Sequence, residues 1–181
     1  MKTKFFLLLA LVVVAFTSCD LNGESNYTPN IFFIQRPINQ HGDSLNSFYT
    51  DKPGVFVMDT MQVGDTVLFY LYMDAYANQL TAFYINQSAD SVSRIVLPDK
   101  ASMDTIFTAG SDYYKGKFIM DGTRNSMRFP FRYIATKASK EAKLEFIVIS
   151  NAQFDGGFAS NSNSFQLKTP IKAFTPPPAS E

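Results

Sequence analysis

Three stretches of the chain alternate between apolar and polar residues with a period of two, and this pattern limits the fold more than any other feature. The stretches are residues 66–74, 127–135 and 143–150. Their apolar faces carry Val67, Phe69, Leu71 and Met73; Met127, Phe129, Phe131 and Tyr133; and Leu144, Phe146 and Val148. Because side chains alternate between the two faces of a strand, the pattern predicts three strands that each bury one face.

Shorter runs predict further strands at 31–34, 55–58, 80–86, 92–97, 103–107 and 114–120, with a last one within 165–172, interrupted at Pro170. Residues 35–52 are rich in Asn, Gly, Asp and Ser and are expected to form a long loop. No stretch shows the period of 3.6 that indicates an amphipathic helix. Short strands at roughly ten-residue spacing are typical of all-β sandwiches and barrels. Apolar faces paired with mixed faces favour an antiparallel β-sandwich of about 7–9 strands.

The last two alternating stretches are expected to pair as a hairpin at the centre of the core. Pro130 lies in the first of them, and because proline lacks a backbone N–H, this strand is expected at a sheet edge or bulged there. Over residues 127–151, the aromatic strand, the charged turn and the run Leu-Glu-Phe-Ile-Val-Ile-Ser-Asn resemble the closing strands of immunoglobulin-like domains. The resemblance implies an immunoglobulin-like sandwich, although the Cys…Trp…Cys hallmark of true immunoglobulin domains is absent.

The first 19 residues begin with Lys-Thr-Lys, continue with an apolar run over residues 5–16 and end with Thr-Ser-Cys. The run is shorter than the roughly 20 residues that a transmembrane helix needs, and the pattern is typical of an export signal. Two kinds of processing are open: ordinary cleavage at the A-x-A-like site 15–17, and lipoprotein processing at Cys19. Residues 16–19 resemble a lipobox with Phe16 in place of the usual leucine. An isolated cysteine in an exported chain favours the lipoprotein interpretation.

The lipoprotein interpretation divides the chain into four segments. They are a signal peptide (1–18), acylated Cys19 with a flexible tether (19–29), a single β-sandwich domain (30–173) and a Pro-rich disordered tail (174–181). A lipobox followed by a small β-domain resembles the uncharacterised lipoproteins of Bacteroidetes cell envelopes. The resemblance implies an outer-membrane lipoprotein that its N-terminal lipid holds to the membrane. A run of acids after the cysteine often marks surface export in that group; only Asp20 and Glu24 follow here, so the periplasmic and surface faces both stay open.

Charge and reactive residues argue against several function classes. Without the first 19 residues the chain has 14 basic and 16 acidic residues, a formal charge of −2, which gives no basis for nucleic-acid binding. The single histidine, His41, lies in the expected long loop, and with Cys19 acylated neither a zinc site nor a disulfide can form. Most Asp residues adjoin turn residues, where they cap turns. We therefore expect no catalytic residue, metal or cofactor.

Four residues at expected strand ends are candidates for ligand contact: Tyr76, Asn78, Tyr113 and Tyr114. Aromatic side chains exposed on loops can serve as platforms for glycans. A second set, Leu68, Tyr70, Tyr72 and Tyr84, is expected to pack against another element or, if exposed as one patch, to bind a partner. The sequence thus favours a binding or assembly role, with the membrane, envelope proteins or glycans as partners. The alternatives are a glycan-binding accessory of a polysaccharide-uptake system and a glycoside hydrolase with a carboxylate pair.

Overall fold

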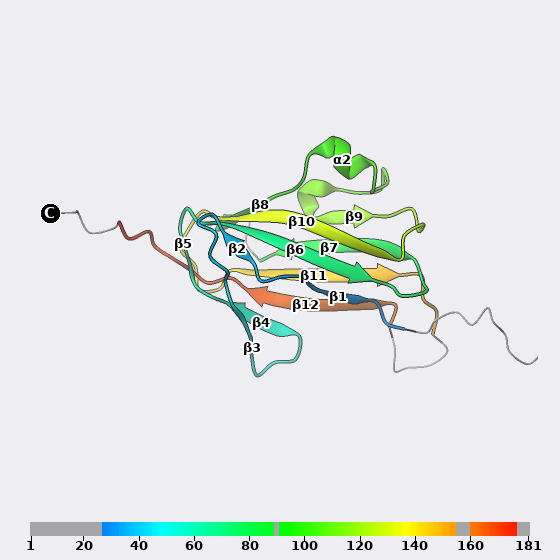
Figure 1. Cartoon of the computed structure of the whole chain (residues 1–181), viewed down its shortest axis with the longest axis horizontal. Helices are drawn as coiled ribbons and strands as arrows, with labels where there is room; N and C mark the ends of the chain where they lie inside the picture. The colour runs from blue at the N-terminus through cyan, green and yellow to red at the C-terminus, as the bar shows by residue number, and fades with distance from the viewer. Residues whose placement is uncertain (1–26, 89–90, 155–159, 177–181) are drawn as a thin grey trace, which may run out of the picture.

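The computed structural model describes residues 27–88, 91–154 and 160–176, which fold into two main β-sheets packed face to face. The first sheet has the strand order β1 (Asn30–Phe33), β6 (Thr66–Asp74), β10 (Ser126–Ala135) and β8 (Ser93–Val96), and β2 (Ile38–Asn39) also pairs with β6. The second sheet has the order β3 (Ser47–Tyr49), β4 (Val55–Met58), β12 (Ser162–Lys168), β11 (Lys143–Ser150), β7 (Leu80–Gln87) and β9 (Lys117–Ile119). Figure 1 shows the two sheets lying one over the other. The expected all-β sandwich is confirmed.

A third, two-stranded sheet lies at one end of the sandwich and consists of β5 (Met61–Gln62) and β13 (Ile171–Lys172). The pairs β5–β13 and β4–β12 are parallel, and the other pairs of described strands are antiparallel. Eight of the 13 described strands have four residues or more, in agreement with the expected 7–9. The other five are pieces of two or three residues, which are too short to show a period.

The strands β10 and β11 lie in opposite sheets, so the hairpin expected between residues 127–135 and 143–150 is wrong. β10 pairs with β6 and β8, whereas β11 pairs with β12 and β7. Their buried faces meet across the sandwich, where the ring centroids of Phe131 and Phe146 are 5.9 Å apart. Alternation predicts which face of a strand is buried, and it is satisfied equally by strands in one sheet or in two facing sheets.

Aromatic rings fill the space between the two sheets. Phe146 contacts Phe165 of its own sheet at 4.9 Å and Phe33 of the first sheet at 5.6 Å between ring centroids. All eleven side chains of the three predicted apolar faces are buried. Each fully buried Phe stabilises the fold by about 1.5–3 kcal/mol relative to exposure. The one hydroxyl in this set, that of Tyr133, is 2.8 Å from Thr169 Oγ1, so its burial leaves it hydrogen-bonded.

Residues 103–107, expected as a strand, form the end of a short helix and a turn. The helix α2 (Lys100–Asp104) begins after Asp99, whose carboxylate accepts the Ser102 backbone N–H at 2.9 Å as an N-cap. Met103 and Phe107 are both buried, because residues four apart lie on one face of a helical turn. Five residues are too few to show a helical period, so the apolar spacing alone predicts the wrong element.

Two other expected elements are only partly formed. In the segment 114–120, expected as one strand, the first residues belong to a 3₁₀ helix, η1 (Tyr113–Lys115), and only β9 is a strand. The expected long loop 35–52 contains the short strands β2 and β3. In both places the backbone pairs over too few residues for the sequence pattern to reveal it.

Pro130 lies in β10 opposite Tyr70 of β6. The Tyr70 carbonyl accepts a hydrogen bond from Ile34 N on the other side of β6, so the Tyr70–Pro130 pair is not a hydrogen-bonded pair of the ladder. The proline nitrogen therefore points away from β6. On that side β8 pairs only with residues 132–135 of β10, so the missing N–H of Pro130 breaks no ladder hydrogen bond. The expectation of an edge strand or a bulge is wrong, because β10 lies between β6 and β8 and pairs with β6 in unbroken register.

Several expectations concern residues beyond the described ones. The signal peptide (1–18), Cys19 and the tether up to residue 26 lie outside the described residues, as does the tail from residue 177. Among the residues that are described, no helix has the length and hydrophobicity that a membrane span requires.

Candidate functional site

A groove of about 880 Å³ lies between β8, the end of β7 and η1. It exists because the chain leaves the sandwich after β8, runs outward through α2 and η1, and returns to the opposite sheet as β9. Figure 1 shows this excursion above the edges of both sheets. The volume falls within the roughly 300–1,000 Å³ that is typical of small-ligand sites.

The groove combines apolar walls with polar side chains. Ile85 and Phe118 are buried and Ile95 and Leu97 are half-buried, and these four supply apolar surface. Its polar lining includes Asn86, Gln87, Arg94 and Lys115. Tyr114 lies in the lining with a fully exposed side chain. An apolar surface with a few hydrogen-bonding groups can hold a ligand and fix its orientation.

The backbone of β8 adds a further binding element. Among the described strands, β8 pairs with β10 alone. Its other edge faces the groove, and unpaired N–H and C=O groups on such an edge can hydrogen-bond an extended ligand.

Gly116 fixes η1 against the end of β7. Its carbonyl accepts a hydrogen bond from Ile85 N at 2.9 Å, and its φ is +62°. A Cβ at this position would lie 2.1 Å from the Ile85 carbonyl oxygen, so only glycine allows this approach. At the other end of η1, the Asp112 carboxylate accepts the Lys115 N–H at 3.2 Å.

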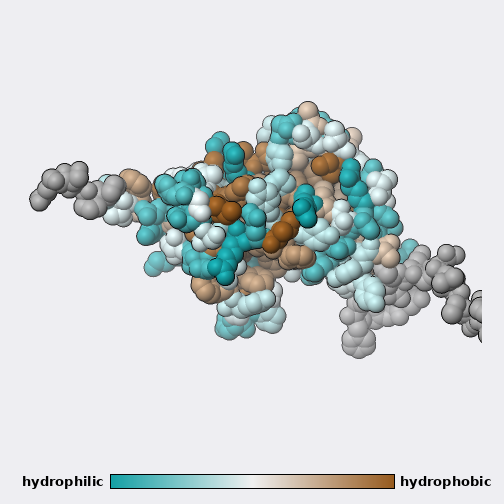
Figure 2. Space-filling view, viewed as in Figure 1, coloured by the Kyte–Doolittle hydropathy of each residue, from teal (hydrophilic) through white to brown (hydrophobic). Residues whose placement is uncertain are grey.

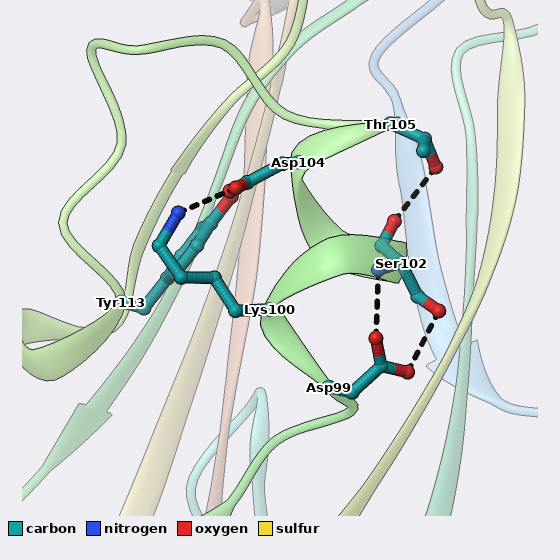
Figure 3. A network of polar contacts seen from close by, with 6 residues as sticks. All are labelled: Asp99, Lys100, Ser102, Asp104, Thr105 and Tyr113. Atoms are coloured by element: carbon teal, nitrogen blue, oxygen red, sulfur yellow. Dashed lines mark hydrogen bonds and ion pairs between the residues drawn. The ribbon is translucent and has the colours of Figure 1, made fainter.

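The phenol of Tyr113 joins η1 to α2. Its OH donates to Asp104 Oδ1 at 3.0 Å, and Asp104 also forms an ion pair with Lys100, as Figure 3 shows. The Tyr113 ring packs on Phe118 at 5.9 Å between centroids. Burial, and then the Asp104 carboxylate, raise the pKa of Tyr113, whereas hydrogen bonds from Lys100 and Tyr113 lower the pKa of Asp104. These contacts hold one wall of the groove.

The structure brings together two of the four predicted site residues. Tyr113 and Tyr114 both line the groove, although Tyr113 uses its ring and hydroxyl for internal contacts. Tyr76 and Asn78 lie before the start of β7, at the end of the strand opposite the groove. With about 3.3 Å per residue, the length of β7 separates the two pairs by roughly 20 Å.

Tyr76 and Asn78 differ in exposure. Tyr76 has a positive φ of 59°, and its exposed ring lies 5.5 Å from that of Tyr27. Asn78 is buried, and its backbone N–H donates to the Ala75 carbonyl at 2.9 Å. This end of β7 therefore offers the exposed rings of Tyr76 and Tyr27, whereas the Asn78 side chain is buried.

The sequence analysis missed most of the polar groove residues, namely Asn86, Gln87, Arg94 and Lys115. They come from three separate elements, and only the path of the chain between the two sheets brings them together. An inspection of strand ends could have marked Asn86 and Gln87, because two amides follow the apolar run of β7. Nothing in the local sequence relates them to Arg94.

Many carboxylates of the described residues cap turns. Backbone N–H groups two or three residues away donate to the side chains of Asp65, Asp74, Asp99, Asp112 and Asp121. Among the described residues that line the groove, none is Asp, Glu, His or Cys. His41 is exposed in the loop after β2, where a ring nitrogen lies 3.2 Å from Gln40 Nε2. Among the described residues, no three potential metal ligands cluster together.

Comparison of the chain with protein-family models and with curated proteins found no match. The site's own geometry therefore carries the argument about function.

Proposed function

We propose that the chain is a lipid-anchored protein of the bacterial cell envelope that binds a ligand in the groove between β8, β7 and η1. The observation that carries the proposal is the combination of apolar walls, polar side chains and an unpaired strand edge around one groove. The anchor is inferred from the lipobox-like residues that end at Cys19. An acylated N-terminus keeps the groove within reach of envelope components.

Binding fits the groove better than hydrolysis does. A glycoside hydrolase needs two carboxyl groups about 5–10 Å apart on either side of the scissile bond. The described lining residues supply amides, hydroxyls, one arginine and one lysine instead. Amides and hydroxyls both donate and accept hydrogen bonds, and Arg and Lys donate them, so these groups suit the binding of a polar ligand.

Cross-linking in whole cells tests the groove as a binding site. A photo-reactive amino acid at position 114 should capture a recurrent envelope component, because Tyr114 projects from the groove lining. The same probe at position 76 is a matched control, since Tyr76 is also an exposed tyrosine but lies at the other end of β7. Equal capture at both positions, or none at position 114, would contradict the proposal.

A glycan is the second candidate ligand. Tyr114 offers an exposed aromatic ring, while Asn86, Gln87 and Arg94 offer planar hydrogen-bonding groups beside it, and sugars combine a stacking face with many hydroxyls. A panel of neutral and acidic polysaccharides, followed by tyrosine fluorescence, tests this. Tyr114→Ala should weaken binding about tenfold or more, because exposed aromatic anchors contribute strongly to affinity. Tyr76→Ala should leave it unchanged, and failure of every polysaccharide to bind would reject the glycan.

The anchor has a separate test. Cys19→Ala should move the protein from the membrane fraction to the soluble fraction, because no acyl chain can then be attached. Tyr114→Ala should remain in the membrane fraction. If the Cys19→Ala protein still sediments with membranes, the lipid anchor is wrong while the groove proposal stays testable by cross-linking.

A further inference from the structure

The outer face of the first sheet combines arginines with aromatic and aliphatic side chains. Its members are Phe32, Ile34, Tyr70, Tyr72, Arg94, Arg128 and Arg132, and we call this surface the arginine face. Figure 2 shows hydrophobic and strongly hydrophilic groups interspersed on the side turned to the viewer. The second set of the sequence analysis, expected to pack against another element or to bind a partner if exposed as one patch, is divided: Tyr70 and Tyr72 belong to this face, whereas Tyr84 lies on the second sheet.

The strand register places arginines beside aromatic and aliphatic side chains. Phe32, Tyr72 and Arg128 stand opposite one another across β1, β6 and β10. The rings of Phe32 and Tyr72 meet edge to face at 5.4 Å. Further along β10, Arg132 stands between Leu68 and Val96. The guanidinium groups therefore project from an apolar and aromatic surface.

The three arginines are unpaired. Within the described residues, none of them forms an ion pair or a side-chain hydrogen bond, and the only acidic residue in the strands of the first sheet is Asp74, at the end of β6. An arginine side chain presents planar donors that match the oxygens of a phosphate. Cations among tyrosine and phenylalanine rings are typical of surfaces that meet the headgroup region of a bilayer.

The tether limits how far this face can lie from the membrane. Tyr27 lies eight positions after Cys19, so an extended tether reaches at most about 28 Å. The nine-residue strand β6 is itself about 30 Å long. Because β1, which follows the tether, is an edge strand of the first sheet, the anchored domain stays within its own length of the lipid headgroups. So short a tether gives even a weak contact a high effective concentration.

We propose that the arginine face docks on a bilayer surface that carries anionic phospholipid headgroups. Arg94, Arg128 and Arg132 contact the phosphates, and Phe32, Ile34 and the two tyrosines lie in the interfacial layer. The proposal rests on the anchor at Cys19. It shares Arg94 with the groove, whereas Arg128 and Arg132 lie outside the groove lining. Each arginine near an anionic surface raises the docked population about fivefold, and three together about a hundredfold.

Reconstitution of the full lipidated protein into vesicles tests the docking. Cys19 is the only cysteine of the chain, so Ile34→Cys introduces one thiol on the arginine face, at an exposed position. Ser164→Cys introduces one on the exposed outer face of the second sheet. The rate of reaction with a bulky maleimide is compared in phosphatidylcholine vesicles with and without phosphatidylglycerol. We expect phosphatidylglycerol to slow the reaction at position 34 about tenfold or more and to leave position 164 unchanged.

Charge variants separate docking by the arginine face from general attraction. The triple variant Arg94→Gln, Arg128→Gln, Arg132→Gln should restore the reaction rate at position 34. The triple variant Lys117→Gln, Lys143→Gln, Lys168→Gln removes the same charge from strands of the second sheet and should not restore it. About 1 M salt, where the screening length is near 3 Å, should act like the arginine variant.

Several results would overturn the docking. Equal protection of positions 34 and 164, equal effects of the two triple variants, or protection in detergent without any vesicle would each do so, the last by indicating a second copy of the chain on this face. Failure of the anchor is distinguishable, because the protein would then not float with the vesicles at all.

Discussion

At the scale of single residues, Gly116 is the position in the groove wall where a side chain is least tolerated. Its φ of +62° is strained for any residue with a Cβ, and that Cβ would also lie 2.1 Å from the Ile85 carbonyl oxygen. Gly122 has a similar φ of +74°, but a Cβ added there would meet no atom within 4 Å. Comparing alanine variants at the two positions therefore distinguishes the cost of backbone strain from the cost of steric overlap.

We expect Gly116→Ala to lower the free energy of unfolding by about 3 kcal/mol or more, because overlap with Ile85 adds to the left-handed backbone cost. Gly122→Ala should cost only about 1 kcal/mol, the backbone term alone. Urea unfolding followed by circular dichroism measures both. Equal losses for the two variants would mean that the close approach to Ile85 does not constrain the wall.

Only one of these glycines could be recognised from the sequence. Asp121-Gly122 is a turn pair, and the structure has the turn there with the Thr123 N–H donating to Asp121. Gly116 stands between two lysines in a segment that the pattern assigns to a strand. Glycine is required at position 116 because of the Ile85 carbonyl oxygen. Ile85 is far away in the chain, and a local sequence pattern cannot predict such a contact.

At the scale of elements, the contact between α2 and η1 depends on two groups that titrate at opposite ends of the pH range. The pKa of Asp104 is lowered, so its contribution to stability is complete above its ordinary value near 3.8 and is lost as pH falls through the lowered pKa. The pKa of Tyr113 is raised, so its contribution is complete below about pH 10 and is lost as pH rises through the raised pKa. The contact is therefore complete across the neutral range.

We expect the amide NMR signals of α2 to move in two steps, one below about pH 4 and one above about pH 10. The pKa of Asp99 is also lowered, chiefly by the Ser102 backbone N–H, so the N-cap of α2 contributes to the acid step. In Tyr113→Phe the alkaline step of α2 should vanish, while the acid step remains because the cap is intact. An alkaline step that persists in Tyr113→Phe would show that another group controls this contact.

Element type was predictable where the pattern is long. The bounds of β6 and β11 agree with the predicted strands, because alternation over eight or nine residues defines both the strand and its buried face. The helix α2 was not predicted, because only one of its five side chains, that of Met103, is buried. Its start signal, Asp99 with Ser102, is a cap that has meaning only when a helix is already suspected.

At the scale of the whole molecule, the sequence does not determine which strands become neighbours. The alternating faces of β10 and β11 suit a hairpin as well as two facing sheets, and the charged segment 136–142 suits either connection. The groove depends on this choice, because it lies where β8 of one sheet and β7 of the other approach each other. The candidate site therefore could not be assembled from the sequence, although two of its tyrosines could be nominated.

The facing-sheet arrangement predicts that the two sheets unfold as one unit. Phe146 of the second sheet contacts Phe131 and Phe33 of the first and Phe165 of its own. Phe146→Ala should therefore lower the free energy of unfolding by about 3–5 kcal/mol, a large part of the 5–15 kcal/mol usual for a domain. Ile147→Ala is the matched control, because this neighbour is on the outer face and only half-buried, and it should cost about 1 kcal/mol.

Two probes can show whether both sheets lose structure together. The chain has no Trp, so its fluorescence comes from tyrosine, including the buried Tyr133 of the first sheet, whereas far-ultraviolet circular dichroism averages over both sheets. In the wild type and in Phe146→Ala we expect the two probes to give one coincident transition in urea, shifted to lower urea in the variant. Separate transitions would mean that each sheet has its own stability, and the rings between them would then fill space without coupling the sheets. Coincident transitions would instead indicate that the aromatic core, to which strands of both sheets contribute, makes the fold cooperative.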